Sequence, residues 1–373
     1  MTIPFKLVSS DSHIVEPPDL WTERIDPKYR LKAPTIVSGV KSDYFVCEGL
    51  PVPRAGIGFT SAALTKAEEL KHQERWENIY RGAWDPRARL SDMERDSVEA
   101  EVLYPTFGLF MYHLEDLGFQ GACFRAYNDW MAEFCSALPD RLFGVAMIAN
   151  DSLDWAIDEM GRAKRMGLRA ALISQSAGSS DSYSNPKYDS LWSQAQDLEL
   201  PISLHLAADK SSFNFTNNIL VDLSLGFTPV MYSVALMIFT GVFDRHPRLK
   251  VATVENEAGW AAIMIERMDY RYERDRFWAK QANGITSGRL PSQQFREHVR
   301  CSFMRDLTAV RARQYIGLDN LMWGSDFPHI DSTWPHSADV LGKHFVDVPV
   351  EHQVKIGRGN CIDLYDLPLD PRG

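Results

Sequence analysis

Short apolar runs alternate with amphipathic stretches along the chain from about residue 90 to the end. This alternation is typical of βαβ units, in which helices connect parallel strands. Together with one run near the N-terminus, the pattern predicts eight strands, at 7–12, 98–105, 142–149, 168–174, 201–206, 249–255, 297–303 and 321–325. Eight strands with helices between them predict an α/β fold, the (β/α)₈ TIM barrel.

The spacing between these runs is helical. Leu153, Ile157 and Met160 fall on one face of a predicted helix, as the 3.6-residue period requires. Asp151 is expected to cap the start of this helix, and Gly167 to end it.

Residues 27–80 depart from the barrel pattern. Prolines and glycines surround a strand-like SDYFVCEG segment, which predicts a small β hairpin, followed by a helix near residues 62–82. We interpret this segment as an insertion after the first strand of a single domain covering residues 1–373. Insertions at the carboxyl ends of barrel strands commonly cover the active site, so the segment is predicted to be a lid.

Composition narrows the class of protein. The 373 residues are 45% hydrophobic and 24% charged, with a formal net charge of −10, and such an acidic balance argues against a nucleic-acid or anionic-membrane partner. Five cysteines, an odd number without a CxxC pair, predict reduced thiols. Neither a signal peptide nor an apolar run of membrane-spanning length is recognised. A cytoplasmic protein is expected.

Polar side chains stand at the ends of three predicted strands. Asp11 and His13 are two residues apart in LVSSDSHI, so a strand would direct both to one side. His205 ends the apolar run PISLHL, and Asp326 follows the strand in LMWGSDFPH. Taken singly, these residues could be a strand-end cap, a core histidine and a turn aspartate. Together they occupy the ends of strands one, five and eight, where barrel enzymes assemble active sites. Two acids with two imidazoles predict a Zn²⁺, Mn²⁺ or Fe²⁺ site.

The chain resembles the amidohydrolase-related family, in the branch of aminocarboxymuconate-semialdehyde decarboxylase and the resorcylate and carboxyvanillate decarboxylases. The resemblance extends from residue 11 to 365 and is carried by DSHIVEP, WDPRARLSDMERDSVEAEVLYPT, LPDRLFGVAMI, PISLHL, GVFDRHPRLKVATVEN, MWGSDFPH and GNCIDLY. It implies that Asp11, His13, His205 and Asp326 hold one divalent metal, with Zn²⁺ as first choice. The fourth strand ends in LISQ, without the lysine that bridges two metals in many hydrolytic relatives.

The sequence departs from the family pattern at strand six. Decarboxylase relatives commonly have a proton-handling histidine there in an HGG motif, whereas this chain has Glu255 followed by Asn256. Glu255 is a candidate acid/base, and the alternatives are an additional metal ligand or a structural hydrogen-bond acceptor. Asn256 and Arg81 are the candidate substrate-binding residues, although no arginine before WDP matches the family position cleanly. His329, just past Asp326, is a candidate catalytic residue.

These observations predict a metal-dependent decarboxylase of a small aromatic or unsaturated carboxylic acid. The alternative is a hydrolase of a C–C, amide or lactone bond that uses a metal-activated water and Asp326 as base. The resemblance also implies a homo-oligomer, with a dimer expected.

Overall fold

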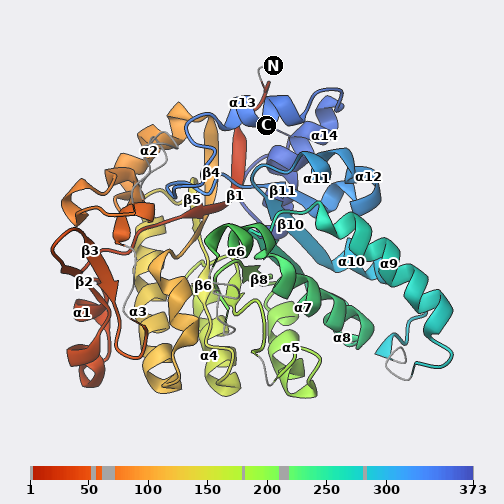
Figure 1. Cartoon of the computed structure of the whole chain (residues 1–373), viewed down its shortest axis with the longest axis horizontal. Coiled ribbons are helices and arrows are strands. Elements are labelled where there is room, and N and C mark those ends of the chain that lie inside the picture. Colours follow the sequence, from red (N-terminus) through yellow and green to blue (C-terminus); the bar gives the residue numbers. More distant parts are fainter. Residues whose placement is uncertain are drawn as a thin grey trace.

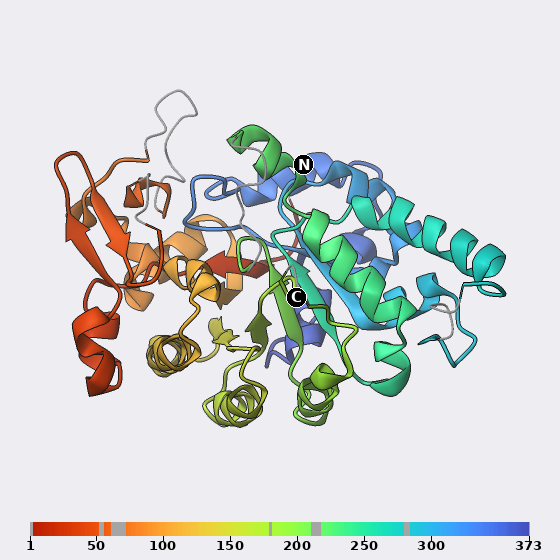
Figure 2. The same cartoon turned by 60° about the horizontal axis from the view of Figure 1, so that its bottom comes forward.

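The structure is a computed structural model that describes residues 3–51, 56–60, 72–178, 181–209, 218–279 and 284–372. Parallel strands form its centre, and helices lie around their outside (Figures 1 and 2). The barrel strands are β1 Leu7–His13, β4 Val98–Tyr104, β5 Leu142–Gly144, β6 Ala146–Met147, β7 Ala171–Ile173, β8 Ile202–His205, β9 Val251–Val254, β10 Val299–Phe303 and β11 Leu321–Trp323.

The strand order confirms the predicted barrel. One sheet has the order β1-β4-β5 and the other β6-β7-β8-β9-β10-β11, with every neighbouring pair parallel. Val145 joins the two sheets, because its N–H bonds to the carbonyl of Leu103, while the next N–H, of Ala146, bonds to that of Ala170. Thus β5 and β6 together are the predicted strand at 142–149, and all eight predicted strands are present.

The last strand returns to the first at the carboxyl ends. The N–H of Asp326 donates to the carbonyl of Asp11 at 2.9 Å, and the N–H of His13 donates to that of Phe327 at 2.7 Å. Gly324 makes this approach possible, since a Cβ there would lie only 2.5 Å from the Cβ of Asp11. The first and eighth strands therefore meet where their polar residues lie.

The connecting helices follow from local sequence. Helix α2 begins where Asp85 accepts hydrogen bonds from the N–H groups of Arg87 and Ala88, with a proline in the first turn. The α-helices are α1 Leu20–Arg24, α2 Pro86–Arg95, α3 Leu117–Ser136, α4 Leu153–Arg165, α5 Asp189–Asp197, α6 Ile219–Leu225, α7 Thr228–Phe239, α8 Val242–Arg245, α9 Trp260–Asp275, α10 Pro291–His298, α11 Leu307–Arg311, α12 Arg313–Ile316, α13 Ser337–His344, α14 Val350–Val354 and α15 Asn360–Tyr365.

Short tight turns complete the connections. They are the 3₁₀ helices η1 Pro27–Lys32, η2 Ile57–Thr60, η4 Trp76–Asn78, η5 Arg81–Ala83, η6 Phe107–His113, η7 Pro186–Tyr188 and η9 Leu318–Asn320, and the π-helical turn η10 Lys355–Gly359. The predicted helix after strand three is α4, and Gly167 follows its end at a φ of 88°. Its N-cap is Ser152, so the prediction of Asp151 is wrong by one residue.

The insertion contains the predicted hairpin. Strands β2 (Thr35–Ser38) and β3 (Asp43–Val46) pair antiparallel and stand at one side of the barrel, with α1 nearby (Figure 1). The predicted helix at 62–82 falls partly on residues 61–71, outside the described residues. Its described part is not α-helical, because Asp43 of the hairpin accepts bonds from the side chain of Arg75 and the N–H of Trp76, both 2.9 Å long.

Two predictions from composition have different outcomes. All five cysteines are free, and only Cys135 is not buried. However, the described residues contain one stretch, Ile219–Phe239, that is long and apolar enough to cross a membrane by length and composition. The prediction that no such run exists is therefore wrong. The stretch consists of two helices, and only 28% of it is buried, with Val230, Val234 and Met237 of α7 on the buried side. One such stretch is weak evidence for a membrane span.

Candidate metal centre

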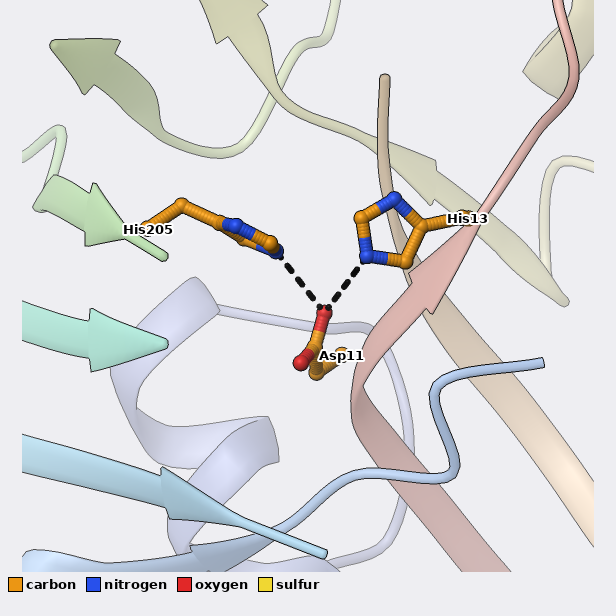
Figure 3. Close-up of side chains that lie close together, drawn as sticks. All are labelled: Asp11, His13 and His205. Atoms are coloured by element: carbon orange, nitrogen blue, oxygen red, sulfur yellow. Dashed lines mark hydrogen bonds and ion pairs between the residues drawn. The ribbon is translucent and has the colours of Figure 1, made fainter. Parts of the chain in front are cut away.

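The four predicted ligand residues converge at the carboxyl end of the barrel. Oδ1 of Asp11 lies 3.5 Å from Nε2 of His13 and 3.4 Å from Nε2 of His205, between the two rings (Figure 3). Oδ1 of Asp326 lies 3.2 Å from the same Nε2 of His13. All four side chains are buried. Residues at the ends of three strands far apart in the sequence thus meet, with His13 in contact with both Asp11 and Asp326 and with Asp11 also close to His205.

Backbone carbonyls fix the orientation of both imidazoles. Nδ1 of His13 donates to the carbonyl of Pro105 at 2.8 Å, and Nδ1 of His205 donates to that of Leu206 at 2.6 Å. A carbonyl can only accept, so the proton of each neutral ring is on Nδ1, and Nε2 presents a lone pair to the cluster. Metal-binding histidines are commonly oriented by such a second contact.

His329 adds a third imidazole. Its Nδ1 lies 2.9 Å from Oδ1 of Asp326, and its Nε2 lies 2.9 Å from the hydroxyl of Thr106. That hydroxyl donates its own hydrogen to the carbonyl of Ile14 at 2.7 Å, so it accepts from Nε2–H of His329. In the neutral ring, Nδ1 therefore faces Asp326 with a lone pair. A proton or a cation must lie between them.

The cluster has the character of a cation site. Nε2 of His13 and Oδ1 of Asp326 are buried and have no hydrogen-bond donor, although such atoms are normally satisfied. Two groups of side chains, Asp11–His13–His205 and His13–Asp326–His329, each place their ligand atoms within 4.8 Å of one another. Imidazole nitrogens and carboxylate oxygens are donors that Zn²⁺, Mn²⁺ and Fe²⁺ all accept. The residues present fit one divalent ion.

Burial dominates the electrostatics of the cluster. It lowers the pKa of His13 and that of His329 to about 3, so both rings are neutral, as ligands must be. Burial alone would raise the pKa of Asp11, but the adjacent imidazoles of His13 and His205 outweigh it and hold that pKa well below its usual range. Burial and the nearby Asp11 carboxylate raise the pKa of Asp326 well above its usual range.

His205 differs from the other two histidines. Burial opposes its protonation, but Asp11 outweighs burial and raises the pKa of His205. Without a metal, a proton on Nε2 would satisfy Asp11, and a bound cation would take the place of that proton.

Glu255 lies beside the cluster and not inside it. Its Oε2 is 3.6 Å from Nδ1 of His205, on the opposite side of the ring from Asp11. Burial, and next the charge of Asp326, raise the pKa of Glu255 well above its usual range, although 23% of its side chain remains exposed. Glu255 has a φ of 55° and Asp326 a φ of 57°. Such left-handed conformations are rare outside glycine and occur often at functional sites.

The two predicted substrate-binding residues do not join the cluster. The side-chain amide of Asn256 donates to the carbonyls of Leu204 and Val254, so it fastens β8 to β9. The side chain of Arg81 is 73% exposed and pairs with Asp85 at 2.9 Å. Arg81 is therefore held in an exposed ion pair and, among the described residues, forms no hydrogen bond or ion pair with the four proposed ligands. Its role in substrate binding stays a prediction.

Two residues that support the centre were missed in the sequence. Thr106 holds His329, as described above. The buried carboxylate of Glu16 accepts from the N–H groups of Phe107 and Gly108 at 2.9 and 2.8 Å and so fixes the loop after β4. A signal existed for both, since each lies within three residues of the end of a strand, but a polar residue there is also typical of ordinary turns.

A parallel α/β barrel with a histidine–aspartate cluster at its carboxyl end is the architecture of a metal-dependent enzyme. The amidohydrolase family model matches residues 71–367, more than half of the chain, and the chain belongs to this family. The matched range includes His205, Glu255 and Asp326 and begins after Asp11 and His13.

Individual relatives have low sequence identity to this chain. Gamma-resorcylate decarboxylase of Rhizobium sp. (strain MTP-10005) is 27% identical over 260 residues, which cover 65% of this chain and 76% of that protein. The enzyme of the same name from Rhodococcus jostii (strain RHA1) is 26% identical over 263 residues, with the same coverage.

Solved structures support the fold. An amidohydrolase of Mycobacterium avium subsp. paratuberculosis K-10 has a TM-score of 0.78 and 22% identity, covering 97% of this chain and 99% of that one. A dihydroxybenzoic acid decarboxylase of Polaromonas sp. JS666, solved with bound manganese and the inhibitor 2-nitroresorcinol, has a TM-score of 0.67 and 18% identity, covering 99% of both chains.

Proposed function

We propose that this chain is a metal-dependent, non-oxidative decarboxylase of a small aromatic carboxylic acid. The observation that carries the proposal is the convergence of His13 Nε2 and Asp326 Oδ1, two buried acceptor atoms 3.2 Å apart without a donor between them. The names of the relatives support the reaction type and an aromatic substrate. An unsaturated non-aromatic acid, the other substrate class that the sequence suggested, is the second group to screen.

Asp11, His13, His205 and Asp326 would hold the ion. When bound, a divalent metal acts as a Lewis acid that binds and orients a carboxylate or an adjacent hydroxyl. We expect Zn²⁺ from the mixed ligand set, while the manganese in the Polaromonas enzyme supports Mn²⁺. Removal of bound metal with a chelator, followed by reconstitution with each ion separately, decides between them by stoichiometry and restored activity.

The chain must supply one proton. In decarboxylation the bond between the ring carbon and the carboxylate breaks, CO₂ leaves, and a proton takes its place on the carbon. Two groups are positioned to supply that proton: the carboxyl of Glu255, beside His205, and the Asp326–His329 pair, whose Oδ1 and Nδ1 atoms are 2.9 Å apart. We propose Glu255 as the donor, because its side chain is the more exposed and can reach a substrate at the mouth. Asp326 and His329 would then orient the reacting group.

We also propose that the insertion covers the pocket. The carbonyl of Phe59 accepts from the N–H of Ile330 at 3.0 Å, and the Phe59 ring lies 6.3 Å from the His329 ring. An aromatic side chain at this point can exclude water and contact an aromatic substrate. Phe59→Ala should raise KM more than it lowers kcat, while Phe59→Leu, which retains an apolar side chain, should have a smaller effect. Equal parameters for Phe59→Ala and the wild-type enzyme would contradict the covering role.

Hydrolysis is the second candidate. It is favoured by Glu255 at the position where decarboxylase relatives have histidine, and by Asp326, a carboxylate able to accept a proton from water. The two reactions are separated with a panel of hydroxybenzoates and muconate-type acids in H₂¹⁸O. A decarboxylase releases CO₂ with no ¹⁸O in the organic product. Incorporation of ¹⁸O without release of CO₂ would overturn the first proposal in favour of the second.

A further inference from the structure

The seam between the first and last barrel strands has no regular ladder among the described residues. β1 pairs with β4 only, and β11 with β10 only. The proposed ligands nevertheless lie on both sides of this seam, with Asp11 and His13 on β1 and Asp326 just past β11. Their mutual distances therefore depend on a few discrete contacts and not on a continuous sheet.

Arg89 of α2 is at the centre of these contacts. Its Nη1 donates to the carbonyl of His13 at 2.8 Å and to that of Gly82 at 3.2 Å, and its Nη2 lies 3.4 Å from the carbonyl of Phe327. The guanidinium also lies 4.8 Å from the centre of the Phe327 ring. Arg89 is fully buried. One side chain thus contacts the backbone of a proposed ligand, His13, and the backbone directly after another, Asp326.

Glu101 of β4 holds Arg89 in place. Its Oε2 pairs with Nε of Arg89, and its Oε1 accepts from the hydroxyl of Ser12 at 3.2 Å. Ser12 lies between Asp11 and His13, and its hydroxyl is 2.9 Å from that of Ser325, the neighbour of Asp326. The buried ion pair therefore reaches both sides of the seam, through Arg89 and through the serines.

We propose that Arg89, held by Glu101, is a positioning residue for the metal centre. It sets the separation of His13 and Asp326 across the seam and contacts neither the ion nor the substrate. This inference rests on the proposed metal site. The physical reason is geometric. A planar guanidinium directs several N–H groups to fixed acceptors at once. A lysine ammonium at the same place retains the charge but not this planar arrangement of donors.

A second buried arginine is a matched control. Arg358 pairs with Glu99 of the same strand β4 at 2.7 Å and donates to the carbonyl of Lys6 at 2.7 Å, directly before β1. It therefore has the same type of contacts to the same two strands, but its contact with β1 is at the opposite end of that strand. If Arg89 only stabilised the barrel, Arg89→Lys and Arg358→Lys should affect the protein in the same way.

The test is a Mn²⁺ titration of purified full-length protein, with free Mn²⁺ measured by electron paramagnetic resonance and folding checked by circular dichroism and thermal melting. We expect both lysine variants to lower Tm. Only Arg89→Lys should weaken Mn²⁺ binding, by roughly 10–100-fold, the usual effect of changing a group that orients a ligand. A Kd within threefold of wild type for folded Arg89→Lys, or an equal loss of affinity in Arg358→Lys, would overturn the proposal.

Glu101→Gln is the second variant, because Arg89→Lys could fail to fold. Glutamine retains the shape of Glu101 but removes the charge that holds the guanidinium, so the Kd for Mn²⁺ should again rise while Arg358→Lys stays near wild type. An unchanged Kd in folded Glu101→Gln would count against the positioning role. If the wild-type protein itself binds no Mn²⁺ stoichiometrically, the metal site proposed above fails, and the positioning role with it. This outcome is distinct from one in which the wild-type protein binds Mn²⁺ and the Arg89 and Glu101 variants bind it equally well. That second outcome overturns only the positioning role.

Discussion

Nε2 of His13 and Oδ1 of Asp326 lie 3.2 Å apart at the junction of the first and last barrel strands. Since the second ring nitrogen of His13 donates to a backbone carbonyl, two acceptor atoms face each other in a buried site. Such an arrangement is stable only with a proton or a cation between them.

Asp326→Asn should weaken metal binding by more than the roughly 10–100-fold typical of residues that only orient ligands, because it removes a proposed ligand charge. Asp331→Asn is the control: Asp331 is on the same loop, 73% exposed and paired with Arg305. Metal content after dialysis, measured by mass spectrometry, checks both variants. Full metal content in Asp326→Asn would exclude Asp326 as a ligand.

Glu255→Gln should lower kcat by roughly 10²–10⁴-fold and leave the metal bound, if Glu255 donates the proton. Glu257→Gln is a matched control two residues away, because the Glu257 carboxylate points to the N–H groups of Met304 and Arg305. Loss of metal together with activity would instead identify Glu255 as a ligand. If kcat is retained, the proton comes from the Asp326–His329 pair.

Arg81→Ala should leave kcat/KM unchanged and reduce stability by less than about 1 kcal/mol, the usual value of an exposed ion pair. Its guanidinium contacts Asp85 and reaches solvent. Steady-state kinetics on the best substrate of the screen measures this. A tenfold rise in KM would restore Arg81 as a substrate-binding residue and imply that the segment moves when substrate binds.

Asp96 should make stability depend on pH. Burial raises its pKa to about 7, and the nearby Glu101 adds to this, while Arg95 and the hydroxyl and N–H of Ser337 oppose it. A carboxyl whose pKa is higher in the folded than in the unfolded state stabilises the fold at low pH, and that contribution is lost as pH rises from about 4 to 7. Asp96→Asn retains the neutral form, so its advantage over wild type should grow across this range to roughly 2–4 kcal/mol.

Chemical unfolding of both proteins between pH 4 and pH 8 measures this difference. Asp140→Asn, which removes an exposed carboxylate elsewhere in the chain, is the control. A difference between Asp96→Asn and wild type that does not change with pH would contradict the assignment.

The barrel and the cluster were predictable for a common reason. Buried parallel strands are nearly continuous apolar runs, so a polar residue at the end of one, such as His205 or Asp326, stands out in the sequence. The role of Arg89 was harder to predict from the sequence. It falls on the buried face of α2 with Asp92 and Met93, and an arginine on such a face is the signal that could have identified it.

Side-chain direction was not predictable. Asn256 follows its strand as Glu255 does, yet its amide bonds to two strand carbonyls while Glu255 faces His205. Glu255 also has a left-handed backbone conformation, which sequence patterns do not reveal. In the same way, the described part of the segment at 62–82 is held by contacts with Asp43 and does not form the predicted α-helix.

The meeting of Asp11 with Asp326 has a consequence for biosynthesis. A ribosome adds roughly 5–20 residues per second, so at least about 15 seconds separate the appearance of the first proposed ligand from that of the last. Until Asp326 is made, a nascent chain has at most two histidines and one acid of the centre and lacks its closing carboxylate. We therefore expect the chain to reach full affinity for the ion only after its last strand has left the ribosome. A chain that is still being translated should not compete with finished protein for scarce metal.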